Sequence, residues 1–335
     1  MRIPRTTIVG SYATGLTMRV PRLPSTGETL LGTGYRVDYG GKGSNQAVGC
    51  ARLGAHVDFI AKIGNDAFGE MALNLYREEG IDLRHVARTT EVPTGVGFIL
   101  VEGDSGNNCI AIDPGANDHL RADDVRACEA AFDGAAVVLT QLEIPSETAE
   151  AALLLGRRYG AITILNPAPV RPLTESMLQA IDILTPNAVE AKVLAGLAPH
   201  ATTDLEAVAR ALIQKGAKRV VMTLGENGAM IVDTSSTSRV AAIRVSALDT
   251  TGAGDAFNAG LATALAYGDS LGQAVQFAVT CGGLAVSKEG VIPALPRRDD
   301  VMRTYQAQGW TPPTWLAAES ADRTDCKAIG TRGKA

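Results

Sequence analysis

The sequence lacks the features of a membrane, secreted or nucleic-acid-binding protein. No stretch of 18 consecutive apolar residues is present, so no segment is predicted to span a membrane. The first ten residues do not follow the pattern of a secretory signal peptide. Lys and Arg total 31 against 36 Asp and Glu, and the formal net charge of −5 argues against a general nucleic-acid surface. We expect a cytoplasmic protein that acts on small molecules.

Cysteine and histidine are too few and too scattered to predict a metal centre. The five cysteines are odd in number and include no Cys-x-x-Cys pair, and the four histidines are equally dispersed. This usage is typical of reduced thiols in a cytosol. Spacing alone does not exclude a Ser-His-Asp triad, but the chain has no Gly-x-Ser-x-Gly elbow to support one. The cysteines are Cys50, Cys109, Cys128, Cys281 and Cys326.

Composition and periodicity indicate an α/β fold. The chain has 335 residues, 46% hydrophobic and 20% charged, which suits one large globular domain or one domain with an elaboration. From about residue 135 onward, short apolar runs alternate with helical stretches, which predicts a mainly parallel sheet covered by helices on both faces. In the predicted helix 203–215, Thr203 and Glu206 have the spacing of a capping box. The predicted strands are 136–141, 162–165, 181–185 and 219–224, and the other helices are 146–159 and one from about 188.

Two segments of the chain have a different pattern. Residues 13–41 and 94–112 are rich in glycine and in short strands, which predicts a small antiparallel sheet that projects from the core. Such a sheet beside a ligand crevice would serve as a lid, and its exposed face would suit pairing with a second copy of the chain. The last fifteen or so residues of the C-terminal tail are expected to be loosely ordered. The predicted core is 1–12, 42–93 and 113–310, and the tail, partly flexible, is 311–335.

The segment from Asp249 to Asp255 is the most informative part of the sequence. It reads Asp-Thr-Thr-Gly-Ala-Gly-Asp, and a helical pattern follows it. Gly252, Ala253 and Gly254 permit a tight turn whose N–H groups would lie at a helix N-terminus, where the helix dipole favours an anion. Asp255 would lie beside that anion, where a carboxylate can take the proton of a hydroxyl that attacks a phosphate. The alternative is a Gly-rich turn with no catalytic role.

Polar residues follow three other predicted strands, at the sheet edge where open α/β proteins bind their ligands. Glu143 follows one strand, Asn187 and Glu190 follow another, and residues 223–228 follow a third. Asn187 and Glu190 have the spacing of a capping box, although an exposed glutamate there could also orient water on Mg²⁺. Residues 223–228 are either a plain β-turn or a backbone ledge for a nucleotide.

Residues 40–46, Gly-Gly-Lys-Gly-Ser-Asn-Gln, open another predicted helix. Glycines around Lys42 would bring the backbone close to a ligand, and Asn45 could both donate to and accept from sugar hydroxyls. The alternative is an ordinary helix N-terminus capped by Ser44, which does not account for the glycines.

Taken together, these motifs resemble the ribokinase family of carbohydrate kinases, also called the PfkB family, over about residues 6–305. The two most specific motifs are residues 40–47 and 249–257. The resemblance implies a three-layer α/β/α core with a mainly parallel sheet and a small β-sheet lid, through which such kinases commonly form homodimers. Supporting matches are Gln141-Leu142-Glu143, Asn166-Pro167-Ala168-Pro169, Thr185-Pro186-Asn187 with Glu190, and Thr223-Leu224-Gly225 with Gly228.

The resemblance also implies an activity and assigns roles to residues. The activity would be transfer of the γ-phosphate of ATP to a primary hydroxyl of a pentose or related sugar. The catalytic residues would be Asp255 as base and Gly252, Ala253 and Gly254 as anion hole. The sugar would be contacted by Gly41, Lys42, Gly43, Asn45, Glu143 and Asp255. The nucleotide would be held by Asn187, Thr223, Gly225, Glu226, Gly228 and Gly254.

Two metal ions are implied by the same resemblance. Glu190 would hold Mg²⁺ through water. A K⁺ ion beside the anion hole would be bound mostly through main-chain oxygens, and a further ligand position, often serine in the family, is Ala294 here. The matching K⁺ positions are Asp249, Thr251, Ala285, Lys288 and Gly290.

The chain departs from the family pattern after its first strand. Ribokinase-like chains usually read Gly-Ser-x-Asn-x-Asp, where the Asn and Asp hold sugar hydroxyls, but here Ala13 and Gly15 occupy those positions. We therefore expect a substrate other than plain ribose. A nucleoside kinase of the same fold and a non-catalytic sugar- or nucleotide-binding protein are the alternatives, and the intact Asp255 argues against the second.

Overall fold

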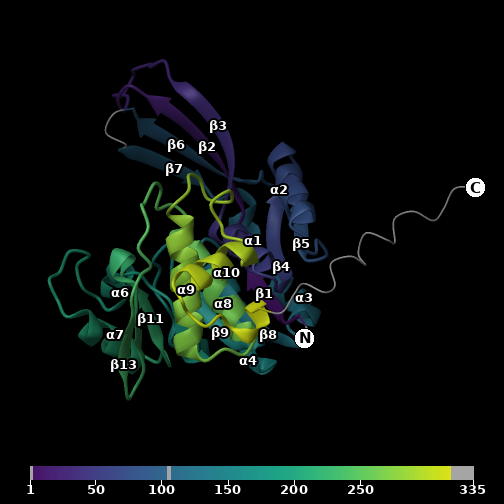
Figure 1. Ribbon diagram of the computed structural model, residues 1–335. Coiled ribbons are helices and arrows are strands. Elements are labelled where there is room, and N and C mark those ends of the chain that lie inside the picture. The colour runs from purple at the N-terminus through teal and green to yellow at the C-terminus, as the bar shows by residue number, and fades with distance from the viewer. Residues whose placement is uncertain (1–2, 104–106, 318–335) are drawn as a thin grey trace, which may run out of the picture.

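The computed structural model describes residues 3–103 and 107–317. A nine-stranded sheet forms the centre of the molecule, and a four-stranded sheet projects from one end of it (Figure 1). The strands from β11 to β5 in the central sheet run parallel, and β12 and β13 join them antiparallel. The order across this sheet is β13 (Thr237–Val240), β12 (Ala229–Val232), β11 (Val220–Thr223), β10 (Ile183–Leu184), β9 (Ile162–Asn166), β8 (Ala135–Gln141), β1 (Arg5–Val9), β4 (His56–Gly64) and β5 (Val86–Thr89).

The central strands are apolar on both faces, because helices cover each side of the sheet. Successive residues Ile8 and Val9 of β1 belong to different hydrophobic clusters, one on each face. The fold is thus the expected three-layer α/β/α arrangement. One cluster includes residues of α1 (Lys42–Arg52), α2 (Ala67–Glu78), α8 (Ala253–Ala266), α9 (Leu271–Ala285), α10 (Arg298–Ala307) and α11 (Thr314–Ala317). The other includes residues of α3 (Ala122–Ala127), α4 (Ser146–Arg158), α5 (Glu175–Ala180), α6 (Ala188–Leu194) and α7 (Leu205–Gln214).

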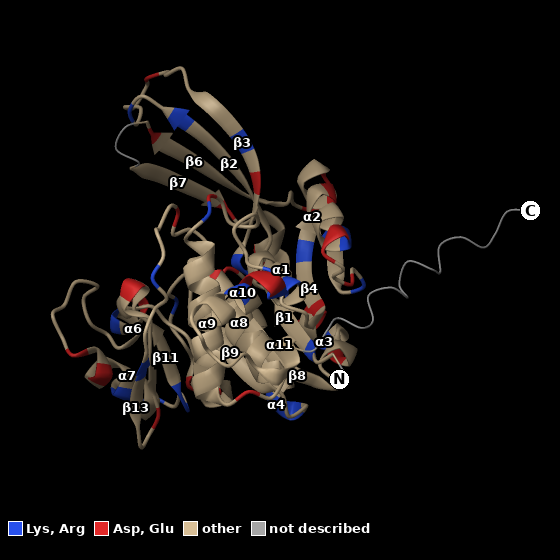
Figure 2. Ribbon diagram, viewed as in Figure 1, with Lys and Arg blue, Asp and Glu red and all other residues tan. Residues whose placement is uncertain are grey.

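Helices α8 and α9 pack against each other almost without charge, as Figure 2 shows by their tan colour. α9 contains no charged residue, and Asp255 in the first turn of α8 is the one charged residue of that helix. A lone buried carboxylate in an apolar helix pair is costly unless it has partners or a function.

The small sheet has the order β3 (Thr33–Gly40), β2 (Ala13–Val20), β6 (Gly95–Glu102) and β7 (Asn108–Asp113). The expectation of a purely antiparallel sheet is wrong, because β2 and β6 pair in parallel. β2 follows β1 and β6 follows β5, and β1 and β5 both run parallel to β4 in the central sheet. Two strands that leave the same end of a parallel sheet start out in the same direction, which accounts for the parallel pair.

The structure corrects the expected cap of α7 and shows where the start of the C-terminal tail packs. The capping box expected at Thr203 is not formed: Asp204 caps α7, and its side chain accepts a hydrogen bond from the Glu206 N–H. In the tail, Trp315 of α11 stacks on Tyr267 at 4.2 Å between ring centroids, so residues 314–317 pack onto the core. The stretch of tail expected to be loosely ordered, and Cys326, lie outside the described residues.

None of the helices in the described part of the chain combines the length and apolarity needed to cross a bilayer. The described cysteines, Cys50, Cys109, Cys128 and Cys281, are free thiols.

Candidate active site

Helices α1 and α8 approach each other closely, and this contact forms the centre of the candidate site. A Cβ added at Gly49 of α1 would lie 2.6 Å from the Cβ of Ala259 in α8, so both positions need small residues. The close crossing brings the first turns of the two helices together. As a result, Asn45 Nδ2 donates to Asp255 Oδ2 at 2.8 Å, and Gln46 Nε2 donates to Asp255 Oδ1 at 2.9 Å.

Asp255 is buried, with only 5% of its surface exposed. Burial raises the pKa of its carboxyl, while the Lys42 charge and the hydrogen bonds from Asn45 and Gln46 oppose that rise. The Asp255 carboxylate in turn raises the pKa of Lys42, in spite of the burial of that ammonium group. A carboxylate held by two amide donors beside a lysine is suited to accept a proton from a substrate hydroxyl.

The glycines at the start of α1 are required by contacts within the chain. Gly41 has φ 86°, and a Cβ there would lie 2.6 Å from Tyr12 Cα. A Cβ at Gly43 would collide with the Ser11 main-chain nitrogen. Packing within the protein is therefore enough to require glycine at both positions, whether or not a ligand also approaches them. The alternative interpretation, an N-cap at Ser44, is wrong, because α1 already begins at Lys42, after Gly41 as N-cap.

Glu143 joins α1 to the segment after β1. Its Oε2 accepts hydrogen bonds from Ser11 Oγ at 2.6 Å and from the Lys42 main-chain N–H at 2.8 Å. Asp255 and Glu143 both act electrostatically on Lys42, and so does Glu190 of α6. The structure thus brings Lys42, Glu143, Glu190 and Asp255 from four segments into one electrostatically coupled group.

The turn before α8 has a backbone conformation that favours glycine at one position. Gly252 caps the helix in the left-handed conformation, with φ 79°. A Cβ at Gly252 would lie 2.6 Å from Val291 Cγ1, whereas one at Gly254 would meet no atom within 4 Å. Ala253 begins the helix, and its N–H donates to the Thr250 carbonyl at 3.3 Å. The next N–H groups of the first turn, at Gly254 and Asp255, precede the first residue that has an acceptor within the helix.

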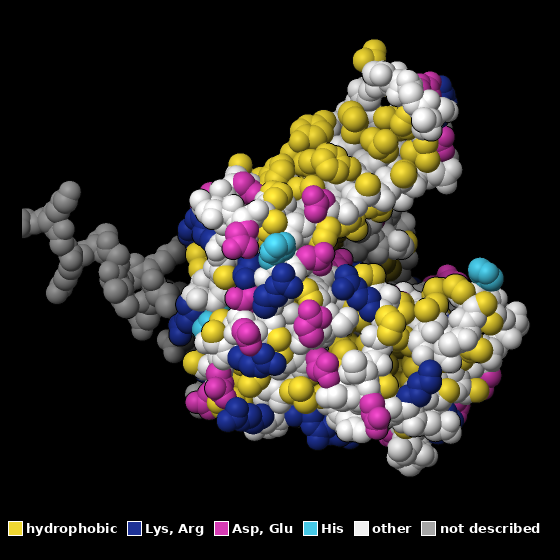
Figure 3. All heavy atoms as spheres, turned by 180° about the vertical axis from the view of Figure 1, so that it is seen from behind, with side chains coloured by type: hydrophobic (Ala, Val, Ile, Leu, Met, Phe, Trp, Pro, Cys, Tyr) yellow, Lys and Arg dark blue, Asp and Glu magenta, His cyan; other side chains and the backbone are white. Residues whose placement is uncertain are grey.

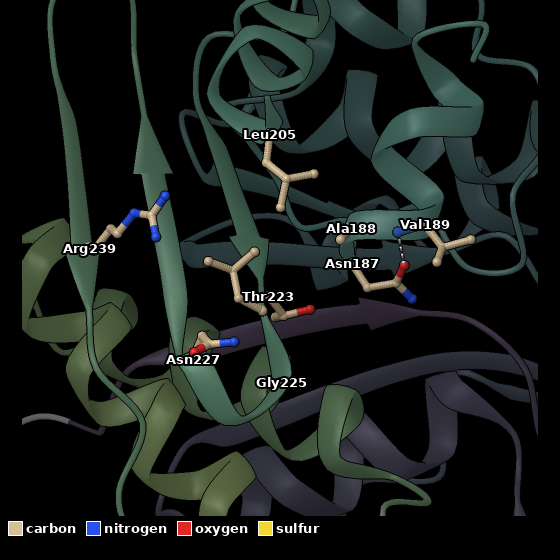
Figure 4. A pocket seen from close by; sticks show the side chains of 9 residues that line it. Asn187, Ala188, Val189, Leu205, Thr223, Gly225, Asn227 and Arg239 are labelled. Carbon is tan, nitrogen blue, oxygen red and sulfur yellow. Dashed lines mark hydrogen bonds between the residues drawn. The ribbon is translucent and has the colours of Figure 1, made fainter. Parts of the chain in front are cut away.

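A pocket of about 410 Å³ lies between α6 and the turn after β11 (Figure 4). Its walls include Asn187, Thr223 and Gly225, three of the residues predicted to hold a nucleotide. Gly225 and Gly228 have positive φ angles of 59° and 81°, so the turn depends on glycine at both ends. Glu226 lies in the short 3₁₀ helix between them and is exposed.

Asn187 and Glu190 form the capping box that their spacing allowed. Asn187 Oδ1 accepts from the N–H groups of Val189 and Glu190, and Glu190 Oε2 accepts from the Asn187 N–H at 2.8 Å. Burial raises the pKa of Glu190, and the hydrogen bond from Asn187 and the nearby Lys42 oppose the rise. The capping role of Glu190 uses Oε2 and leaves Oε1 for a ligand.

The two segments predicted to bind K⁺ are joined through Asp249. Its Oδ1 accepts from the Thr251 N–H at 2.9 Å, and its Oδ2 accepts from the Gly290 N–H at 3.0 Å. Burial would raise the pKa of Asp249, but its hydrogen bonds to Thr251 and Gly290 lower it overall. Of the other expected positions, the Ala285 carbonyl accepts a long 3.2 Å bond from the Lys288 N–H, and Ala294 is buried. The described residues contain no cluster of three or more His, Cys, Asp or Glu side chains suited to a metal.

The comparisons with known proteins decide the family. The pfkB family carbohydrate kinase model matches residues 5–298. The chain belongs to the pfkB family of carbohydrate kinases. It is 37% identical to a ribokinase from Haemophilus influenzae over 88% of this chain and 96% of that protein, and 31% identical to a deoxyribokinase from Salmonella typhi over 86% and 94%. The structure of Arabidopsis thaliana ribokinase complexed with ribose and ATP superposes with a TM-score of 0.84 at 30% identity, covering 90% of this chain and 98% of that one. This pfkB-family protein is an ATP-dependent sugar kinase.

The sequence did not reveal how much of this kinase's site is a buried amide network. Gln46 Oε1 accepts from Gln141 Nε2 at 2.5 Å, and Gln46 Nε2 also reaches Asn166 Oδ1 at 3.2 Å. One pattern in the sequence could have indicated it: residues 42, 45, 46 and 49 share one face of a helix, and three of them are polar. The partners from β8 and β9 could be found only from the fold.

Proposed function

We propose that this sugar kinase transfers the γ-phosphate of ATP to a primary hydroxyl of its sugar, with Asp255 as the general base. The observation that supports this role best is the buried Asp255 carboxylate at the N-terminus of α8, held by two donors from α1. The hydroxyl oxygen attacks the γ-phosphorus, the bond from that phosphorus to the ADP oxygen breaks, and the hydroxyl proton passes to Asp255. ATP turnover measured with a panel of sugars tests the proposal.

The sugar would bind beside Asn45, Lys42 and Glu143. The Oδ1 atom of Asn45 is buried and has no hydrogen-bond partner among the described residues. A buried acceptor without a donor is costly, and a sugar hydroxyl would supply the missing donor. Gly41 and Gly43 would contribute main-chain contacts at the same helix start. The nearby Lys42 charge would help to balance the phosphate charge.

The nucleotide would lie along the pocket of Figure 4, with its phosphates directed toward Gly252, Ala253 and Gly254. The first-turn N–H groups of α8 would stabilise the negative charge that develops on the transferred phosphoryl group. Mg²⁺ suits hydrated oxygen sites with few carboxylates, and Glu190 offers one carboxylate oxygen beside its capping bond. When bound, the ion would neutralise charge on the phosphates.

K⁺ would bind beside the anion hole. The residues fit a monovalent cation because Asp249 holds the segments around Thr251 and Gly290 together, and its own lowered pKa keeps it ionised near neutral pH. Main-chain oxygens at Ala285, Lys288 and Gly290 would complete the site. The ion would fix the turn that carries the anion hole.

The substrate would present fewer or different hydroxyls to the lid than ribose does. Ala13 lies at the root of the lid, next to Gly41, and shares a sheet face with Gly15. The strand pairing places Gly97 and Ile112 on that same face. The polar groups of this face lie at other positions: Asp38 beside Gly15, and Arg36 beside Thr17, with Arg36 Nε 3.6 Å from Asp38 Oδ2. A deoxysugar, a ketohexose or a substituted pentose would suit it better than ribose.

A homodimer would form through the opposite face of the lid. Tyr35, Val37 and Phe98 lie on that face and are 63%, 38% and 55% exposed. Figure 3 shows hydrophobic side chains gathered over the lid. Covering them with a second copy of the sheet would remove this apolar surface from water. Sedimentation of wild type and of Phe98→Lys tests the dimer, which the lysine should dissociate.

A cytoplasmic location would match the free thiols.

A further inference from the structure

The Asp255 carboxylate lies at one end of a hydrogen-bond network made of three buried amide side chains. Gln46, Gln141 and Asn166 are 0%, 1% and 7% exposed. Gln46 donates to Asp255 Oδ1 at 2.9 Å and to Asn166 Oδ1 at 3.2 Å, and its own oxygen accepts from Gln141 Nε2 at 2.5 Å. These residues come from α1, β8 and β9, so the network joins a helix to two strands of the central sheet.

The carboxylate determines which way each amide of this network is oriented, with its NH₂ group or with its oxygen toward the next side chain. An ionised carboxylate only accepts hydrogen bonds, so Gln46 must turn its NH₂ group toward Asp255. Its oxygen then faces Gln141, which must also present NH₂. Gln46 Nε2 donates one hydrogen to Asp255 and the other to Asn166. Asn166 Nδ2 in turn donates to the Thr185 carbonyl at 3.3 Å.

The Gln141 amide, at the far end of this network, is tightly enclosed by the backbone. A side chain at Gly10 would collide with the amide oxygen of Gln141, so the backbone lies directly against that amide. The Gln141 oxygen is buried and has no hydrogen-bond partner among the described residues. An unpaired buried acceptor costs free energy. The opposite orientation of Gln141 would be worse, because it would turn the Gln141 oxygen toward the oxygen of Gln46.

Gln46 therefore differs from Asn45, its neighbour on α1. Asn45 has a free buried acceptor that a sugar could use, whereas Gln46 is fully enclosed and its hydrogen bonds are all made within the protein. Of its three partners, Asp255 is the one with the proposed catalytic role. The two donors sit on consecutive residues of one helix and hold different oxygens, so they fix the plane of the carboxylate.

We propose that Gln46, aligned by Gln141 and Asn166, is a positioning residue that holds the Asp255 carboxylate in its proton-accepting orientation and stabilises its ionised form. This inference rests on the proposed role of Asp255 as base. The other charged groups that act on Asp255 are Lys42 of α1, Glu143 after β8 and Glu190 of α6. Burial raises the pKa of Asp255, and the hydrogen bond from Gln46 is one of the contacts that lower it again.

The test is the pH dependence of kcat/KM in Gln46→Met, which keeps the side-chain length and removes the donor. With one charge-assisted hydrogen bond lost, the acidic limb of the profile should move up by about one to two pH units. At neutral pH kcat should fall about tenfold or more, while KM for ATP should stay near the wild-type value. Above the shifted limb, part of the loss in kcat should be recovered.

A second variant separates positioning from simple stability. Gln141→Met leaves the Gln46–Asp255 contact possible but removes its alignment, so the limb should move in the same direction by a smaller amount. The double variant should move the limb no further than Gln46→Met alone, because both changes act through one contact. The control is Thr148→Val in α4, which removes a buried hydrogen bond to the Leu120 carbonyl and none of the contacts of the amide network. It should lower Tm without moving the limb.

The outcomes are distinguishable. A folded Gln46→Met with an unmoved acidic limb would overturn the positioning role, as would a limb that moves equally in Thr148→Val. If Gln46→Met does not fold, Gln141→Met carries the test alone, and an unmoved limb there overturns the inference. Asp255→Asn, measured in parallel, reports on the base itself: near-normal turnover in that variant would reject the proposed base, not only its positioning.

Discussion

Asn45 and Asp255 are 210 residues apart in the chain, and a 2.8 Å hydrogen bond joins Nδ2 of the amide to Oδ2 of the carboxylate. The bond connects the first turns of α1 and α8, the two most specific motifs of the sequence. It also leaves the Asn45 oxygen buried and unpaired among the described residues. The amide of Asn45 thus holds the expected base through its nitrogen and offers its oxygen to the expected sugar. One side chain therefore links substrate binding to the position of the base.

Replacement of Asn45 by alanine should affect the sugar more than the nucleotide. The variant loses the acceptor for a sugar hydroxyl and one of the two donors to Asp255. We expect kcat/KM for the sugar to fall by about 10- to 100-fold, as for a lost hydrogen bond in a closed pocket, with KM for ATP nearly unchanged. The control is Asn74→Ala, an exposed asparagine of α2 that accepts from Arg77. A sugar kcat/KM close to wild type would contradict the assignment.

The glycines at the N-terminus of α8 offer a matched pair of variants. Gly252→Ala places a Cβ in the left-handed region and against Val291, so both Tm and turnover should fall. Gly254→Ala meets no neighbouring atom, so its Tm should stay the same or rise, since alanine favours a helix by about 0.5–1 kcal/mol. If a phosphate approaches here, Gly254→Ala should still raise KM for ATP or lower kcat. Normal kinetics in the stable Gly254→Ala variant would count against the anion hole.

Substrate choice should depend on Ala13 and Gly15. Each unpaired hydroxyl in a closed pocket costs about 1–3 kcal/mol, so the double variant Ala13→Asn/Gly15→Asp should gain kcat/KM on ribose. The structure has room for it, because a Cβ at Gly15 would meet its nearest atoms, in Asp38 and Ile99, at 3.7 Å. The measurement is kcat/KM of wild type and double variant across pentoses, ketohexoses, deoxysugars and nucleosides. The hypothesis fails if ribose is already the best wild-type substrate and the double variant gains nothing on it.

Potassium should activate the enzyme by fixing the turn before α8. Activity should rise with K⁺ and respond far less to Na⁺ or Li⁺, and Asp249→Asn should weaken this activation. The lack of a side-chain ligand at Ala294 would lower the affinity for the ion without abolishing it. Equal rates in K⁺-free and K⁺-containing buffer would contradict this prediction.

The family and the fold could be predicted because they depend on short motifs and on local periodicity. The Gly-x-Gly-Asp turn before α8 and the alternation of strands and helices are both readable within a few residues. The family, the fold class and the ATP-dependent sugar kinase activity are confirmed. The roles of individual residues, the ions and the homodimer stay predictions.

Errors arose where a local pattern competes with a long-range contact. Ser44 has the chemistry of a cap, but packing of Gly41 and Gly43 on the Ser11–Tyr12 backbone starts α1 three residues earlier. The parallel pairing of β2 with β6 follows from where both strands leave the central sheet, which no local pattern in either strand records. The contact of Gln46 with Gln141 and Asn166 likewise exists only once β8 and β9 lie beside α1.

The most direct test of the account is the turnover of Asp255→Asn with the best sugar substrate. The variant keeps the size of the side chain but cannot accept the hydroxyl proton. We predict a kcat lower by roughly 100- to 10,000-fold, with the fold and ATP binding retained, which is the range for loss of a positioned base. Circular dichroism and ATP titration of the variant control for misfolding. Near-normal turnover in a folded, ATP-binding Asp255→Asn enzyme would contradict the account.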